Sequence, residues 1–487
     1  MTPPMTIGII GAGMSGFFTA RAMARAGHQV VLLEADNPPP GDVETSFMQW
    51  NRTGVAQFRQ PHAARSIIVK RLRERDPQLL QAIIDGGMVP WEFHLLGLPH
   101  EDGGTHDPEL LGLLGRRAAL EVPLRNLVLS MPGVRLVRTT VQNLLFSVGS
   151  PRRVEGVLTS DGPMRFDSTV DSSGRRSRVA DWLGAAGIEP PPAQSNECGI
   201  VYYSRNFRFR PGVEVPRGSY PSGPGATMAG VHFTMNRTDA RSFTLMLGVT
   251  PDQEEFRALR QEAVFMNFAS SLPDANLWLA PKISEPIWKV EPFAGLTNRY
   301  RPFSRDGLPL VADLYVMGDA RFHTNPVHGW GMSFALQMSY MLADAFAAHA
   351  DPLARLSAFE QQADAYARRY FEASSCEDAA RRQLWTDLDF SNRGEPGTYR
   401  HYLTSVQPAL YKDQVIFRAL TRRLHLLDDP AQVLGNQAVQ ERAARIGASL
   451  NQRLSRAQLV QLALEAQASA ARATTAAAPA TAMEAGA

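Results

Sequence analysis

Cysteine is scarce in this sequence: only Cys198 and Cys376 occur among 487 residues. Two cysteines cannot build a disulfide framework, and neither lies at a metal-ligand spacing from another cysteine. No run of about 18 apolar residues, the length that spans a bilayer, occurs either. We therefore expect a cytoplasmic protein of a reduced compartment, without a membrane-spanning segment.

Charge of one sign is also nearly absent. The formal net charge is +2, and no cluster of lysine and arginine is interleaved with aromatic residues. Such a basic patch is typical of nucleic-acid binding, so we expect no nucleic-acid partner. The chain is longer than about 250–300 residues, the size at which single cores tend to divide, so more than one domain is expected.

What the sequence does contain begins near its amino-terminal end. Residues 6–13, TIGIIGAG, indicate a buried strand that ends in glycines. Residues 15–27 have the composition of a helix of small residues, and residues 28–34 indicate a second buried strand. Strand, glycine turn, helix and strand together predict a βαβ unit.

The glycine turn of this unit fits the fingerprint of a dinucleotide-binding site. Gly11 permits a tight turn, Gly13 lets backbone amides approach a pyrophosphate, and Gly16 lets the helix pack closely on the strand. The helix N-terminus offers partial positive charge to the phosphates, and Glu34 can accept hydrogen bonds from a ribose diol. Both FAD and NAD satisfy the motif. The predicted cofactor-binding residues are Gly11, Gly13, Met14, Ser15, Gly16 and Glu34.

A second glycine-rich segment, LYVMGDARFHTNPVHGWGMS, occupies residues 314–333. An apolar strand runs into Gly318-Asp319, and Gly329 and Gly331 precede a helix of small and apolar residues. A carboxylate at a strand end accepts hydrogen bonds from hydroxyl groups, and small residues at a helix entrance let a ligand come close to the backbone amides. The segment therefore predicts a ligand that carries hydroxyls and phosphates.

The remaining elements are expected with less detail. Helices are expected at 63–87, 117–130, 253–271, 332–349 and over most of 353–465; strands and turns alternate over 134–174 and dominate 198–299; and residues 187–197 are expected to be a linker.

Two segments of the chain resemble the class A flavoprotein monooxygenases of the para-hydroxybenzoate hydroxylase type. The segment VDSSGRRSRVADWLG, residues 170–184, is similar to the family's Asp-Gly segment. The residues 318–331, Gly-Asp followed by Pro-x-x-Gly-x-Gly, resemble its Gly-Asp motif and the helix after it. Shorter stretches such as GVAQFRQPH at 54–62 look like the FAD-dependent epoxidases of polyether pathways, with squalene epoxidase as a more distant relative.

The resemblance implies an α/β fold with a Rossmann-like FAD-binding domain, an inserted and mostly antiparallel β-sheet substrate domain, and a helical C-terminal region. The implied ranges are 1–197 together with 300–345 for the FAD-binding domain, with loops near the flavin at 50–115, then 198–299 for the substrate domain, 346–466 for the helical region and 467–487 for a disordered Ala/Thr-rich tail.

The resemblance also implies roles for individual residues. In the family the Asp-Gly segment contacts FAD and the nicotinamide cofactor; here Asp171, Gly174, Ser177 and Arg178 fall on it. The Asp319 carboxylate would bind the ribitol chain, and the helix entrance after it would face the pyrimidine edge of the flavin. The family often has an arginine at a helix start against the cofactor, which would be Arg117. Arg117 and its neighbour Arg116 are alternatively solvated surface charges.

The implied reaction uses FAD, NADPH or NADH, and O2, and proceeds through a flavin C4a-hydroperoxide. The substrate would be a lipophilic alkene or aromatic molecule, epoxidised or hydroxylated in secondary metabolism. The alternatives are a reductase or oxidase of the geranylgeranyl-reductase-like kind, a halogenase-like enzyme, and a dinucleotide-binding scaffold without catalysis. The halogenase alternative is disfavoured because PIWKVEPF, at 286–293, lacks the Trp-x-Trp-x-Ile-Pro arrangement of those enzymes.

Candidate catalytic residues are Arg59, His62 and Trp330. Arg59 and His62 fall in the segment where the family places loops near the flavin, although each is alternatively a loop residue that only fixes the backbone. Trp330 replaces the polar or small residue that the family has between its glycines, and it either lines the pocket or points into the core. Further histidines, expected to serve in packing or at the surface, are His94, His323 and His328; the side chains expected to make the substrate domain lipophilic are Phe233, Met235, Phe243, Met246 and Trp288.

Overall fold

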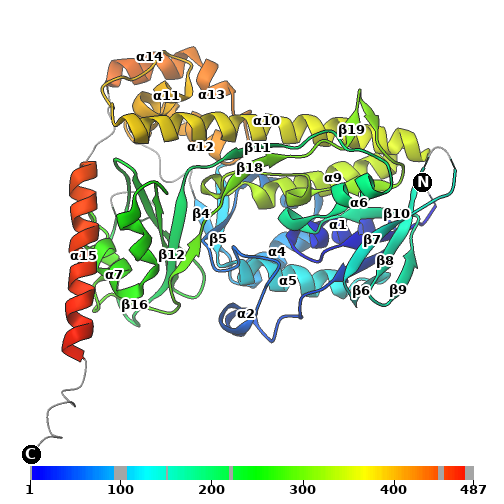
Figure 1. The fold of residues 1–487 in the computed structure, drawn as a ribbon, viewed down its shortest axis with the longest axis horizontal. Coiled ribbons are helices and arrows are strands. Elements are labelled where there is room, and N and C mark those ends of the chain that lie inside the picture. Colours follow the sequence, from blue (N-terminus) through cyan, green and yellow to red (C-terminus); the bar gives the residue numbers. More distant parts are fainter. Residues whose placement is uncertain (1–2, 93–106, 150–151, 219–222, 448–453, 478–487) are drawn as a thin grey trace, which may run out of the picture.

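A computed structural model describes residues 3–92, 107–149, 152–218, 223–447 and 454–477. The molecule is elongated, with a parallel sheet toward one end and an antiparallel sheet toward the other (Figure 1). The long helix α10 (Pro352–Asp387) runs along the side of the molecule and joins the two halves (Figure 1). Among the residues that the structure describes, no helix combines the length and apolar character that crossing a bilayer requires.

The central sheet has five parallel strands in the order β21-β10-β1-β2-β6. Its members are β1 (Thr6–Ile10), β2 (Gln29–Glu34), β6 (Val134–Arg138), β10 (Ser168–Asp171) and β21 (Leu314–Val316). Helix α1 (Met14–Arg25) links β1 to β2, which confirms the predicted βαβ unit.

Both faces of this parallel sheet are buried, as is usual for parallel strands. One face packs Ile7 and Ile9 into a large apolar cluster with Phe17 of α1. The same cluster includes residues of three further helices, α5 (Arg117–Leu129), α9 (Gly331–Ala348) and α10. The opposite face carries Ile10 and Val31 and is covered by α6 (Val179–Ala185) and the small sheet of β7 (Val141–Phe146), β8 (Val154–Thr159) and β9 (Gly162–Arg165).

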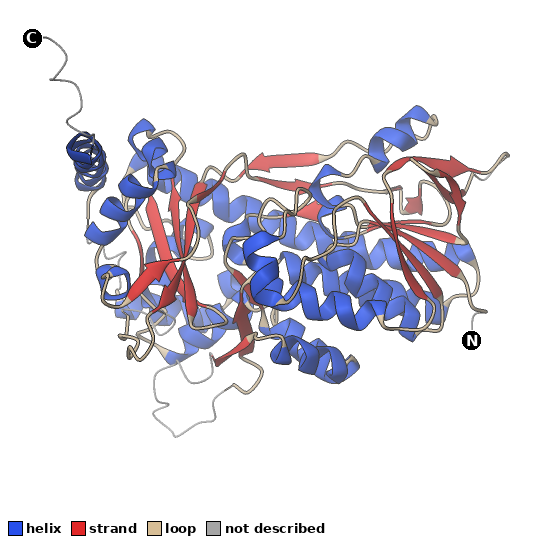
Figure 2. Cartoon of the chain, turned by 90° about the horizontal axis from the view of Figure 1, so that it is seen from below, coloured by secondary structure: helices blue, strands red, loops and turns tan. Residues whose placement is uncertain are grey.

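The antiparallel sheet has the order β13-β14-β15-β12-β16, and β17 also pairs with β12. Its strands are β12 (Val201–Phe209), β13 (Gly225–Thr227), β14 (Val231–Arg237), β15 (Ser242–Val249), β16 (Ser284–Pro286) and β17 (Glu291–Phe293). One face packs on α7 (Glu262–Ser271), α8 (Asn276–Leu279) and α15 (Arg456–Ala477). Helix α15 lies at the outer edge of this layer in both ribbon views (Figure 2).

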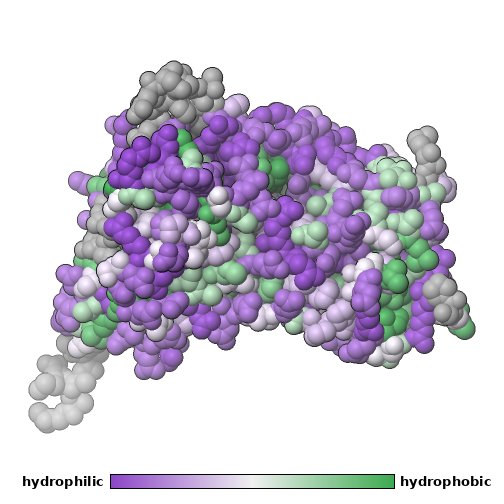
Figure 3. All heavy atoms as spheres, turned by 90° about the horizontal axis from the view of Figure 1, so that it is seen from above, coloured by the Kyte–Doolittle hydropathy of each residue, from purple (hydrophilic) through white to green (hydrophobic). Residues whose placement is uncertain are grey.

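The remaining elements are shorter or lie outside the two main sheets. The short strands are β3 (His62–Ala64), β4 (Val89–Glu92), β5 (Leu111–Gly115), β11 (Gln194–Glu197), β18 (Thr297–Tyr300), β19 (Ser304–Arg305), β20 (Leu308–Pro309) and β22 (Phe322–His323). The remaining α-helices are α2 (Val43–Gln49), α3 (Ser66–Arg75), α4 (Pro77–Asp85), α11 (Tyr399–His401), α12 (Gln414–Leu424), α13 (Gln432–Gly435) and α14 (Gln437–Ile446). The 3₁₀ turns are η2 (Gly174–Arg176), η3 (Glu254–Arg260), η4 (Gly318–Ala320), η5 (Pro326–His328) and η7 (Gln407–Ala409), and η6 (Tyr402–Val406) is a π-helical turn. The face seen from above is mostly hydrophilic (Figure 3).

Several predicted elements differ from the structure. The helix expected at 63–87 is instead β3 followed by two helices, because Asp76 ends α3, caps α4 through the Leu79 amide and precedes Pro77. The helix expected at 253–271 begins as the 3₁₀ turn η3 and becomes α-helical at Glu262. Part of the expected linker 187–197 is strand β11, which pairs with β18.

The disorder predicted from residue 467 onward is wrong for the described part of the tail. Helix α15 continues to Ala477, and Leu459, Ala463, Ala466 and Ala470 are buried along one of its faces. Their spacing of three and four residues forms an apolar stripe that packs with α7 in one cluster. Alanine-rich composition therefore reflects close helix packing here.

Candidate active site

A cavity of about 1170 Å³ lies between the two sheets and the C-terminal helices. Four parallel strands point their carboxyl ends at this cavity. Each end contributes one residue to the wall: Ile10 from β1, Glu34 from β2, Ser172 just after β10 and Gly318 just after β21. Ligands of open α/β sheets bind at this edge. The volume exceeds the roughly 300–1000 Å³ of most small-molecule pockets, so the cavity has room for more than one ligand.

The glycine turn between β1 and α1 has three differently constrained glycines. Gly11 has φ +91°, and a Cβ there would lie 2.8 Å from the Ser172 carbonyl oxygen. A Cβ on Gly16 would lie 2.0 Å from the Gly11 oxygen, whereas a Cβ on Gly13 would meet nothing within 4 Å. Gly11 and Gly16 therefore serve the fold, and Gly13 leaves open space on the cavity side.

Glu34 lies at the cavity wall and is fixed by backbone amides. Its Oε2 accepts a hydrogen bond from the Ala12 amide at 2.9 Å, and its Oε1 accepts one from the Asp36 amide at 2.9 Å. The carboxylate thus joins the glycine turn to the end of β2. Each oxygen retains a further lone pair for a ligand hydroxyl.

A buried ion network that the sequence did not reveal lies behind Glu34. Arg52 donates to Glu121 at 2.7 Å and lies 3.6 Å from Glu34, while Arg117 donates to the other Glu121 oxygen at 2.7 Å. Burial alone would raise the pKa of Glu121, but the two arginines outweigh it and the pKa is lowered. The network holds Arg117 at the cavity wall. Arg116 instead binds Asp239 of the antiparallel sheet region, and both arginines are buried, so neither is a solvated surface charge.

Asp171 does not line the cavity, although the sequence placed it among the cofactor-binding residues. It is fully buried at the end of β10, where it accepts hydrogen bonds from the amide and hydroxyl of Ser173 and from the Ser177 hydroxyl. Burial raises the pKa of Asp171 despite these bonds. The carboxylate therefore shapes the loop. Of the loop residues that the sequence predicted, Gly174, with φ +82°, and Arg178 line the cavity, whereas Ser177 does not.

The segment after β21 brings a carboxylate and a second helix N-terminus to the same cavity, beside the α1 turn. Asp319 lines the cavity, and its Oδ2 lies 3.3 Å from Arg175 Nε. Helix α9 begins at Gly331, and a Cβ on Gly331 would be 3.9 Å from Asp319 Oδ1. Neither α9 nor α1 has a side-chain N-cap hydrogen bond. Two helix N-termini with free amides therefore open on one cavity, the arrangement that binds anionic groups.

The three candidate catalytic residues have different surroundings. Arg59 is outside the cavity: its guanidinium donates to the Phe47 carbonyl at 3.1 Å and lies 3.9 Å from the Trp288 ring centre, so we drop it from the catalytic candidates. His62 lines the cavity and pairs through Nδ1 with the Gln60 carbonyl at 2.8 Å. Burial, aided by Arg117, lowers the pKa of His62 to about 3, so its ring is neutral at physiological pH.

Trp330 is a buried part of the wall. Its indole N–H donates to the Leu424 carbonyl at 3.0 Å, and its ring stacks on His328 at 4.2 Å. His328, Leu424 and His323 also line the cavity. His94 and part of the 50–115 loop region lie outside the described residues. Because its polar atom is satisfied by backbone, Trp330 provides shape and contributes no acid or base.

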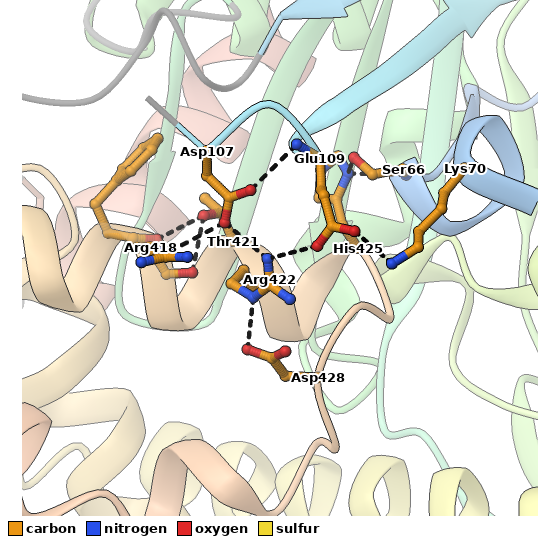
Figure 4. A network of polar contacts seen from close by, with 10 residues as sticks. Ser66, Lys70, Asp107, Glu109, Arg418, Thr421, Arg422, His425 and Asp428 are labelled. Atoms are coloured by element: carbon orange, nitrogen blue, oxygen red, sulfur yellow. Dashed lines mark hydrogen bonds and ion pairs between the residues drawn. The ribbon is translucent and has the colours of Figure 1, made fainter. Parts of the chain in front are cut away.

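The far wall of the cavity comes from the C-terminal region. Its lining residues include Tyr402, Gln407, Leu410, Tyr411, Lys412, Leu420, Thr421, Arg423 and Leu424. Helix α12 supplies several of them and is anchored on its other side by ion pairs (Figure 4). Arg422 lies 2.7 Å from Asp107, 3.0 Å from Glu109 and 2.9 Å from Asp428. The network joins α12 to the segment before β5.

The apolar side chains expected to shape the substrate region divide into two groups. Met246 lines the cavity, whereas Phe233, Met235 and Phe243 belong to the core on the other face of the sheet, and Phe233 also borders the cavity. Trp288 packs on Arg59 away from the cavity. The apolar wall consists instead of residues that sequence reasoning missed: Trp91, Leu114, Phe293, Leu410, Leu420 and Leu424.

Comparison with known proteins shows which proteins have a similar sequence or fold. Residues 9–65 match the model of an NAD(P)-binding Rossmann-like domain. Protein Rv3254 of Mycobacterium tuberculosis is 26% identical over 365 residues, which cover 68% of this chain and 71% of that protein. A kynurenine 3-monooxygenase of Xanthomonas campestris is 25% identical over 378 residues, which cover 73% of this chain and 75% of the enzyme.

Solved structures agree on the fold. p-Nitrophenol 4-monooxygenase PnpA of Pseudomonas putida superposes with a TM-score of 0.58 at 16% identity, covering 88% of this chain and 99% of that one. PqsL of Pseudomonas aeruginosa, a probable FAD-dependent monooxygenase, has a TM-score of 0.56 at 14% identity, covering 79% and 99%. The flavin-dependent brominase Bmp2, as a triple mutant, has a TM-score of 0.58 at 15% identity, covering 90% and 100%. The predicted resemblance to flavoprotein monooxygenases is thus confirmed for the fold.

Proposed function

We propose that this protein is an FAD-dependent monooxygenase that uses NADPH or NADH and O2 to oxidise a small organic molecule. The observation that carries the proposal is that two uncapped helix N-termini and two carboxylates face one cavity. In this proposal the pyrophosphate binds at the α1 N-terminus, Glu34 accepts the ribose hydroxyls and Asp319 accepts the ribitol hydroxyls. The relatives and structural neighbours named above support the same class.

The residues present fit this cofactor. The open side of Gly13 leaves room for a phosphate group against the backbone. Arg117 and Arg178, both on the wall, add positive charge near the phosphates. At the other end, the α9 amides favour negative charge on a flavin ring. We assign residues 1–197 and 300–345 to cofactor binding and 198–299 to the substrate side.

The cofactor, when bound, supplies the electron transfer and oxygen chemistry. The chain then has to hold the substrate close to the flavin and keep water away from it. Trp330 and the α12 residues Leu420 and Leu424 form an apolar wall suited to excluding water. His62 is uncharged at neutral pH and is a poor general base. Epoxidation of an alkene or hydroxylation of an activated aromatic ring therefore suits the site, and a place in secondary metabolism is part of the proposal.

The test is whether an oxygen atom of O2 enters the product. Purified protein should show the visible absorption of a flavin that is released on denaturation. A panel of aromatic and alkenyl compounds should include members that stimulate NAD(P)H oxidation, and ¹⁸O from labelled O2 should enter the product. Stimulated oxidation without ¹⁸O in the product would favour a reductase, and bromide-dependent halogenation would favour the brominase chemistry of Bmp2. A colourless protein that binds no flavin would refute the proposal.

A further inference from the structure

Arg65 is a buried arginine at the cavity without a carboxylate partner. It follows β3 and precedes the first residue of α3, and it is only 6% exposed. Its Nε and Nη2 donate to the His328 carbonyl at 3.1 and 2.6 Å. Its Nη1 is buried and has no hydrogen-bond partner among the described residues. The guanidinium thus presents an unused donor and an uncompensated charge.

The other buried arginines of the cavity wall are all paired. Arg52 and Arg117 share Glu121 at 2.7 Å each, and Arg423 binds Glu377 at 2.6 Å. For Arg65, no acidic side chain lies within ion-pair distance in the described part of the chain. A buried charge that is neither paired nor fully hydrogen-bonded is costly, so such an arginine is usually completed by a ligand.

The surroundings of Arg65 suit the end of a flat, mostly apolar molecule. Its guanidinium carbon lies 5.6 Å from the centre of the Trp91 ring, and Leu410 and Leu424 line the same cavity. Ser66, the next residue, binds His425 at the end of α12 (Figure 4), with 3.0 Å between its amide and Nδ1. Arg65 therefore lies where the cofactor side of the cavity meets the C-terminal wall.

We propose that Arg65 binds a carboxylate of the substrate, so that the substrate is an aromatic or alkenyl acid. The inference rests on the proposed function, because it names the substrate of that same site. A carboxylate would receive the free Nη1 hydrogen bond and supply the missing negative charge. The apolar wall would hold the ring or alkene, and the anchored acid would fix which carbon faces the flavin.

The experiment compares two probes of nearly equal shape, benzoate and benzamide, by calorimetric titration of the flavin-loaded protein. Benzoate should bind about 20-fold more tightly than benzamide, because only benzoate forms a charged hydrogen bond with Arg65. In R65Q this preference should fall to within about twofold, with flavin content unchanged. In R65K part of the preference should return, since a cation remains. R73Q, which removes an exposed arginine on the same helix, should behave like the natural protein.

The results separate three explanations. Equal binding of the two probes by the natural protein overturns the inference, whether or not R65Q folds. Loss of flavin in R65Q, together with equal probe binding, would assign Arg65 to the cofactor and also overturn it. If the protein binds no flavin at all, the proposed function fails, but the same benzoate preference, measured on the flavin-free protein, would still establish an acid-binding site at Arg65.

Discussion

The two ends of the cavity are built in contrasting ways. At the nucleotide end, the wall consists of backbone amides and glycines from short turns at strand ends, with Gly13 and Gly331 as examples. At the C-terminal end, the wall consists of side chains from Tyr402 to Leu424, including those of η7 and α12, which lie more than 300 residues after β4 and its Trp91. The first end suits one cofactor of fixed shape, whereas the second end is shaped mainly by its side chains.

The largest expected effect concerns the nucleotide end. Substitution Gly13→Val should reduce flavin affinity by about 100-fold, because the added side chain fills the open space where a phosphate would approach. The melting temperature of the flavin-free protein should change little, since a Cβ at this position meets no protein atom within 4 Å. Visible absorption after gel filtration and thermal unfolding measure the two quantities.

Gly16 provides the matched control. Gly16→Val should destabilise the fold by roughly 1–3 kcal/mol or more, because its Cβ would lie 2.0 Å from the Gly11 oxygen. If Gly13→Val lowered stability and kept full flavin content, the distinction between a ligand-facing and a packing glycine would be wrong.

A smaller effect is expected from Asp319. Removal of its carboxylate in Asp319→Ala should weaken flavin binding by about 10-fold, the value of one good hydrogen bond to a charged group. Fluorescence titration with FAD measures the change. Asp181→Ala, which removes an exposed carboxylate on α6, should leave the affinity unaltered. Unchanged affinity in Asp319→Ala would contradict the placement of the ribitol chain.

The next prediction concerns Arg422, whose ion pairs anchor helix α12 of the C-terminal wall. Arg422→Met should lower the free energy of unfolding by about 1–2 kcal/mol, because it removes a network of three acidic partners in which Arg422 is only 17% exposed. Flavin content should not change. Arg257→Met breaks a pair whose arginine is 67% exposed and should cost less than about 0.5 kcal/mol. If urea unfolding showed the same loss of stability for Arg422→Met and Arg257→Met, the ion-pair network would not hold α12.

The smallest expected effect is a flat pH profile. Burial lowers the pKa of Arg65 to about 10, so the guanidinium stays charged from pH 6 to 9, while a carboxylic acid with a pKa of about 4 stays ionised. Burial lowers the pKa of both neighbouring histidines, His328 and His425, which favours their neutral form in this range. Benzoate affinity should therefore be constant between pH 6 and 9. A fall in affinity between pH 6 and 7 would mean that a histidine binds the acid.

The same contrast explains how much could be predicted from the sequence. Gly11, Gly13 and Glu34 were recognisable because a βαβ unit fixes their geometry within about 30 residues. Arg52, Arg65 and the α12 wall could not be recognised in the sequence, because their place in the site depends on contacts with residues far away along the chain. Asp171 shows the limit of motif reasoning: it was expected to contact the cofactor, but its carboxylate turns inward to Ser173 and Ser177. Alanine composition misled in the tail, since packing on α7 overrode it.

Helix α15 has a consequence for the order in which the protein is made. The apolar layer around Phe265 and Phe268 of α7 is completed only by Leu459 and Ala463, which are among the last residues that the structure describes. During synthesis, nearly 200 residues must leave the ribosome after α7 before its cover arrives. Until then the apolar outer face of α7 is exposed to solvent, and this interval is when a chaperone would be needed most.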